Sequence, residues 1–227
     1  MLPPPRFNHF EVLIEVVYSL IVSLSCFFIY FKTKELYELT SYRGLKYFRN
    51  TFLFFGISFL IRLLLHFVRP FERNPFLLRP LSMLTLDIAF FIMVYCSSMA
   101  LIYIIYSVLW KKLDKKWFSK TYLFHTVSIL LAMLSVILRT PVIIFIFQAM
   151  LFISLIVLGY HNYKKGNNKN SFSHLYLIYI LIFALGIISN TLEFVSIFSP
   201  IVAIAIYVAS IIVFLIMLFR VAKRLNS

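Results

Sequence analysis

Long apolar stretches alternate with short polar segments along the whole chain. Each apolar stretch is close to the roughly 17–25 residues that a bilayer-spanning helix needs. They predict seven transmembrane helices, at approximately residues 10–31, 48–68, 83–110, 121–138, 141–160, 174–198 and 200–219. The segments between them are too short for a second domain. We therefore predict one all-α membrane domain over residues 1–227, folded as a seven-helix bundle.

Basic residues lie mostly on one side of these predicted helices. Of the 22 Lys and Arg residues, sixteen fall in the segments after the first, third, fifth and seventh helices, and five fall on the opposite side. Cytoplasmic loops carry an excess of Lys and Arg. The N-terminus is therefore expected outside and the C-terminus in the cytoplasm, in a multi-pass protein of the cell membrane.

Composition excludes several classes of protein. With 62% hydrophobic and 13% charged residues, the chain has more apolar surface than a soluble domain could bury. The net charge of +14 is explained by anionic lipids at basic cytoplasmic loops, so nucleic acid is not expected as a partner. No HExxH or GxSxG motif and no His/Cys set with metal spacing occurs, so we expect neither catalytic residues nor a metal.

One basic residue, Arg62, lies inside a predicted helix rather than in a loop. A charge deep in a membrane helix costs about 2.5–3.5 kcal/mol, so it is expected to face the bundle interior and to be paired. Other polar residues share its predicted outer half of the membrane. They predict an outward-facing polar pocket whose candidate ligand-binding residues are Glu15, Arg62, His66, Asp87, Gln148, Asn190 and Glu193. The alternative is an ion network that fixes helix positions and binds nothing.

The inner half of the bundle is predicted to be nearly all apolar. His125 is the exception, and it is interpreted as a packing or interfacial residue. The basic segment 32–50 is predicted to be helical or partly helical at the lipid headgroups, with an interruption at Gly44. Cys26 and Cys96 lie in predicted spans and are interpreted as small packing residues.

Seven helices with an outside N-terminus, in a chain of this length, resemble the microbial rhodopsin architecture. That family carries retinal on a lysine of its last helix, and residues 201–219 contain no lysine, so neither retinal nor another cofactor is expected. The segment 42–65 resembles the entry to the second helix of prokaryotic seven-helix sensor regions, which often precede a histidine kinase. This resemblance implies that any signal passes to a separate membrane or cytoplasmic partner.

The sequence favours a non-enzymatic sensor or receptor-like membrane protein. Two alternatives stay open, namely a small-solute or proton-coupled transporter and a structural or assembly subunit of a membrane complex. A transporter needs a polar path through both halves of the membrane, and the predicted apolar inner half argues against one.

Overall fold

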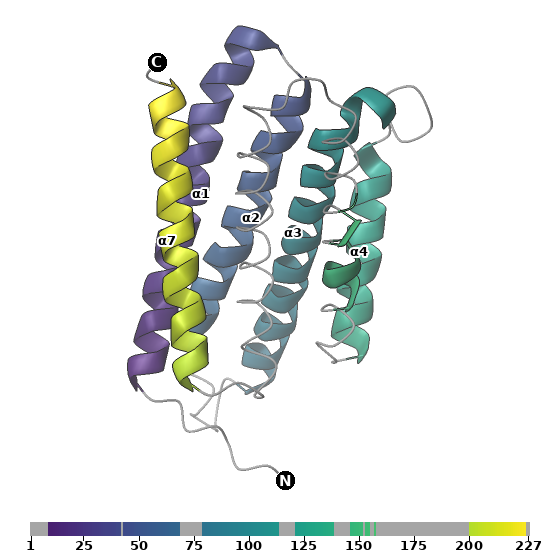
Figure 1. Ribbon diagram of the computed structural model, residues 1–227. Helices are drawn as coiled ribbons and strands as arrows, with labels where there is room; N and C mark the ends of the chain where they lie inside the picture. The colour runs from purple at the N-terminus through teal and green to yellow at the C-terminus, as the bar shows by residue number, and fades with distance from the viewer. Residues whose placement is uncertain are drawn as a thin grey trace.

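The computed structural model describes residues 9–41, 43–68, 79–113, 121–138, 146–151, 153–154, 157 and 200–225. These residues are helical apart from Ser41, and they include no strand, so the predicted all-α class is confirmed for this part of the chain. The long helices are α1 (His9–Thr40), α2 (Arg43–Val68), α3 (Arg79–Leu113), α4 (Thr121–Leu138) and α7 (Pro200–Leu225) (Figure 1).

The observed helix boundaries agree best with the predicted ones where an apolar stretch begins or ends abruptly. Helix α4 has the predicted bounds, and α7 begins at the predicted Pro200. The predicted helix at 141–160 is described only at 146–151, 153–154 and 157, and the one at 174–198 lies outside the described residues.

The predicted interruption at Gly44 is wrong. Helix α1 continues to Thr40, and the chain turns at Ser41, which has a φ of 51°. The Ser41 amide donates to the Tyr37 carbonyl at 2.8 Å, which ends α1 with a helical hydrogen bond. Gly44 lies inside α2 and does not have a positive φ. It therefore does not use the conformational freedom that often makes glycine a break in a helix.

The helices lie side by side in chain order from α1 to α4, and neighbours run in opposite directions (Figure 1). Helix α7 packs against α1, so the last helix lies beside the first. Helix α1 begins at one end of the bundle, and α7 ends at the other (Figure 1).

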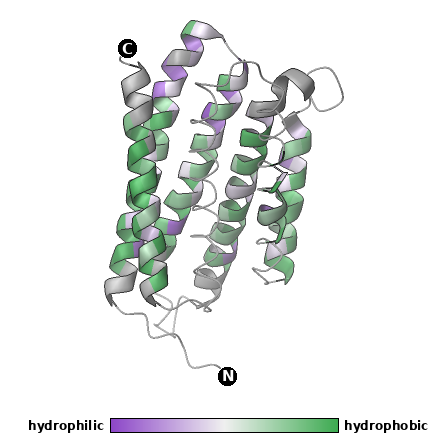
Figure 2. Ribbon diagram, in the orientation of Figure 1, coloured by the Kyte–Doolittle hydropathy of each residue, from purple (hydrophilic) through white to green (hydrophobic). Residues whose placement is uncertain are grey.

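Three helical segments among the described residues are long and apolar enough to cross a membrane, namely Leu13–Thr40, Arg43–Leu65 and Leu84–Ser107. Tyr122–Leu138 and Ile204–Ile216 are shorter apolar helices. Figure 2 shows hydrophobic positions along the middle of the helices and hydrophilic ones where α1 meets α2. A row of exposed apolar side chains follows one face of α1, as contact with lipid requires: Leu13, Val17, Leu20, Leu24, Phe28 and Phe31.

The core between α1, α2 and α7 is aromatic and closely packed. It includes Tyr18, Phe52, Phe55, Phe59 and Phe214, all at most 2% exposed. Helices α1 and α2 approach each other at Gly56, where an added Cβ would lie 3.1 Å from the Cβ of Cys26. A small residue permits this approach, and the Ser23 hydroxyl donates to the Gly56 carbonyl at 3.2 Å.

Candidate functional site

Arg62 on α2 forms a buried ion pair with Glu15 on α1. Nη2 and Nε of Arg62 donate to the same carboxylate oxygen, Oε1 of Glu15, at 2.5 and 3.0 Å. The Arg62 side chain is 1% exposed and that of Glu15 is 11% exposed. The structure therefore brings together two of the predicted site residues, from neighbouring helices.

Tyr207 of α7 is the third member of this group. Its hydroxyl lies 3.2 Å from Nη2 of Arg62, and its ring centroid lies 5.9 Å from Cζ of Arg62. We call Glu15, Arg62 and Tyr207 the outer cluster, after the side of the membrane that the sequence predicts for this end of the bundle. It links three helices, and its α7 member is separated from Arg62 by 145 positions in the sequence.

The sequence analysis missed Tyr207, because it counted ionisable and amide side chains but no tyrosine. The position of Tyr207 along its predicted helix could have identified it. Tyr207 lies seven residues after the start of α7 and Arg62 six residues before the end of α2, which places both about 10 Å from the same end of the bundle at 1.5 Å per residue. A buried tyrosine hydroxyl at the depth of a buried arginine is a natural partner for it.

Aromatic rings close the outer cluster toward the middle of the bundle. The Tyr18 ring contacts the Tyr207 ring at 4.9 Å and the Phe59 ring edge-on at 5.5 Å. Farther along the same helices, Phe55 packs on Phe59 at 4.9 Å and on Phe214 at 6.1 Å. These rings exclude water, so the charges of Glu15 and Arg62 interact in an environment of low dielectric constant.

A buried ion pair of this kind specifies an arrangement more than it adds stability. The cost of removing two charges from water can exceed their attraction, whereas deleting one partner costs about 3–5 kcal/mol. The pair joins α1 to α2 at this level, and removing either partner would leave the other charge buried.

Gln148 does not join the outer cluster. Its Nε2 donates to the hydroxyl of Ser97 at 2.9 Å. The bond from Ser58 to the Met93 carbonyl, 3.2 Å long, sets the register of α2 against α3. Arg62 lies four residues nearer than Ser58 to the end of the bundle where α1 begins, and Ser97 lies four residues farther from that end than Met93. The bond of Gln148 is therefore about 12 Å farther from that end than Arg62. Sequence position alone had placed Gln148 in the outer part of its predicted helix.

The structure describes the remaining predicted site residues only in part. Asp87 lies on α3, partly exposed, and by the same register it is within about one turn of the depth of Arg62. His66 is in α2, one turn after Arg62, but its side chain lies outside the described residues. Asn190 and Glu193 also lie outside them.

A second polar group lies deeper, between α2, α3 and α4. The Tyr95 hydroxyl and Nδ1 of His125 are 2.7 Å apart. Phe54 and Tyr103 complete an aromatic cluster around this pair, with ring centroids 6.4 Å or less from that of His125. The sequence analysis set His125 apart from an otherwise apolar inner half. Tyrosines, which count as hydrophobic in the composition, bring hydroxyl groups into the layer around it.

The described residues form an all-helical bundle that includes three helices of membrane-spanning length. No protein-family model matches the chain. A protein of the archaeon Archaeoglobus fulgidus, described as uncharacterized, is 32% identical over 230 residues, which cover 98% of this chain and 97% of the relative. The chain belongs to the family of that archaeal protein. No solved structure matches it.

Proposed function

We propose that the protein is a seven-helix, multi-pass protein of the cell membrane that acts as a non-enzymatic sensor or receptor, with its N-terminus outside and its C-terminus in the cytoplasm. The distribution of basic residues supports this orientation. Helix α1 begins and α7 ends at opposite ends of the bundle, as an odd number of crossings requires (Figure 1). The contact between α1 and α7 suits a closed ring of helices.

The contact between Arg62 and Tyr207 is the observation that carries the proposed sensor role. It connects the ion pair to α7, a continuous helix of 26 residues. At 1.5 Å per residue this helix is about 39 Å long, so it reaches from the outer cluster to the predicted cytoplasmic side. A small polar molecule that pairs with Glu15 or Arg62 would weaken the contact with Tyr207 and shift α7 as a unit.

The aromatic layer beneath the outer cluster favours a receptor over a transporter. Phe55, Phe59 and Phe214 fill the space between α1, α2 and α7 on its inner side. A molecule bound at Arg62 from outside therefore meets packed rings on the inner side of the cluster. A pocket that opens outward and is closed on its inner side is the arrangement that sensing requires.

The test combines a ligand screen with a distance measurement in nanodiscs. Thermal-shift assays with amino acids, small carboxylates and quaternary amines identify a solute that stabilises the purified protein. Spin labels at Glu38→Cys and Phe219→Cys then report the separation of α1 and α7, both residues being exposed. The native Cys26 and Cys96 are buried and free, which favours selective labelling.

The proposed function predicts that a stabilising solute changes the label distance and that Tyr207→Phe abolishes this change. Tyr122→Phe is the matched control, because Tyr122 is 57% exposed on α4. The sensor function is refuted if no solute in the panel stabilises the protein. It is also refuted if a stabilising solute leaves the distance unchanged.

A transporter is the second candidate, favoured by the polar groups at the deeper level. Gln148 with Ser97, and Tyr95 with His125, place polar side chains beyond the depth of Arg62 on the α3 and α4 side. Uptake of the stabilising solute into proteoliposomes decides between the two candidates. The sensor function predicts binding without accumulation, and accumulation would establish transport instead.

A further inference from the structure

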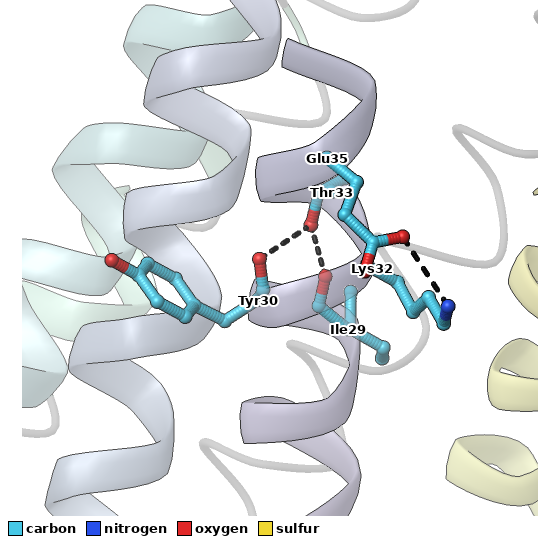
Figure 3. A network of polar contacts seen from close by, with 5 residues as sticks. All are labelled: Ile29, Tyr30, Lys32, Thr33 and Glu35. Atoms are coloured by element: carbon cyan, nitrogen blue, oxygen red, sulfur yellow. Dashed lines mark hydrogen bonds and ion pairs between the residues drawn. The ribbon is translucent and has the colours of Figure 1, made fainter. Parts of the chain in front are cut away.

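Charge is unevenly distributed where α1 meets α2. On the α1 side the basic residues are paired, with Lys32 3.3 Å from Glu35 (Figure 3) and Lys34 3.8 Å from Glu38. On the α2 side, residues 43–68 contain no Asp or Glu. The first two turns of α2 therefore carry three basic residues and no acidic one.

Three basic residues recur every third position at this end of α2: Arg43, Lys46 and Arg49. Arg43 and Lys46 are exposed, and Arg49 is partly buried. Six residues of helix separate the first from the last, a rise of about 9 Å. The polar zone on each side of a bilayer core is of similar thickness, about 5–8 Å. The row therefore extends over the depth of the lipid headgroups.

Two tyrosines of α1 hold Arg49 in place. Its Cζ lies 5.3 Å from the Tyr30 ring centroid and 5.4 Å from the Tyr37 ring centroid. Tyr30 and Tyr37 are two helical turns apart and share one face of α1. Because both rings restrict the guanidinium, binding a ligand costs it little further conformational entropy. Nε of Arg49 is buried without a hydrogen-bond partner.

We propose that Arg43, Lys46 and Arg49 form a binding site for the phosphate of an anionic lipid headgroup. Arginine binds phosphate through two parallel hydrogen bonds, and lysine adds a point charge. A lipid is the occupant rather than a soluble anion, because large apolar side chains are exposed nearby on α1, with Phe31 at 61% and Leu39 at 85% exposure. The site is independent of the proposed sensor function, since it needs only a chain that spans a membrane.

Native mass spectrometry of the full-length protein tests this site, with phosphatidylglycerol and phosphatidylcholine as probes. The variant is R43Q/K46Q, which removes two exposed charges from α2. The matched control is K32Q/K34Q, which removes two charges from α1 at the same end of the bundle. Each basic residue near an anionic surface strengthens lipid binding roughly fivefold. Losing two is therefore expected to lower the retention of phosphatidylglycerol roughly thirtyfold.

The lipid site predicts that R43Q/K46Q loses phosphatidylglycerol, that K32Q/K34Q retains it, and that neither variant changes the retention of phosphatidylcholine. Equal loss in both variants would show a general effect of net charge and would overturn the site. Displacement of the lipid by inorganic phosphate would identify a soluble anion as the occupant and would also overturn it. Arg49→Lys keeps the charge, and its retention of phosphatidylglycerol is expected to fall several-fold, because the planar guanidinium is lost.

Discussion

Replacing Glu15 and Arg62 singly and together tests whether the two residues act as a pair. The single variants are Glu15→Leu and Arg62→Met, which substitute apolar side chains of broadly similar size. Each leaves the other charge in a site where Arg62 is 1% and Glu15 11% exposed. A buried charge without its partner costs about 3–5 kcal/mol, which is therefore the expected loss of unfolding free energy for each single variant.

The double variant is expected to be more stable than either single one. Replacing both members of a buried ion pair by apolar residues is often neutral. The remaining loss comes from the Tyr207 hydroxyl, whose bond to a charged group contributes about 1.5–3 kcal/mol. The two single losses together therefore exceed the loss in the double variant by roughly 3 kcal/mol or more.

Equilibrium unfolding in mixed micelles with increasing sodium dodecyl sulfate measures these free energies. Leu24→Ala is the control, because Leu24 is 60% exposed on α1 and far from the pair. Its unfolding free energy should stay within about 0.5 kcal/mol of the parent. Additive losses in the double variant would contradict the reasoning, since they would show that Glu15 and Arg62 stabilise the bundle independently.

The same unfolding assay tests three further sites. Gly56→Leu should cost about 1–3 kcal/mol, because its Cβ alone would lie 3.1 Å from Cys26; an unchanged stability would contradict the close approach of α1 and α2. Gln148→Leu should be neutral within about 1 kcal/mol, because Oε1 is buried without a partner; a loss above about 2 kcal/mol would show that the whole amide is bound. Tyr95→Phe should lower the unfolding free energy by about 0.6–1.5 kcal/mol, because it removes the hydroxyl that contacts His125. An unchanged unfolding free energy would show that this contact does not stabilise the folded state.

Apolar periodicity predicted the described helices well, because lipid requires each crossing segment to be continuously apolar and helical. It predicted their ends less well where helices continue into water. Helix α1 extends to Thr40 and α2 begins at Arg43. Both therefore include parts of the basic segment 32–50, which lies largely outside the predicted spans but was expected to be helical or partly helical. The pairs of Lys32 with Glu35 and Lys34 with Glu38 suit a helix in water, and hydropathy averages do not register such spacing.

Burial cost predicted that Arg62 would be paired, and depth left Glu15, Asp87 and Glu193 as candidate carboxylates. The structure pairs Arg62 with Glu15. Depth could not fix direction around each helix axis, which decides which side chains meet. Gln148 shows the difficulty, since its bond to Ser97 depends on how its helix packs against α3. Tyr207 shows another, because tyrosine counts as apolar in composition while its hydroxyl can bind a charged group.

The two polar groups lie on different sides of α2, and this separation bears on how the protein would work. Arg62 directs its guanidinium toward α1 and α7, where Phe59 and Phe55 follow on the inner side. Phe54, one position from Phe55, packs against Tyr95 and Tyr103 on the opposite side. Adjacent residues of α2 thus belong to two different layers of rings. A displacement of α2 at Arg62 would therefore move both layers of rings together, because Phe54 and Phe55 are adjacent residues of one helix.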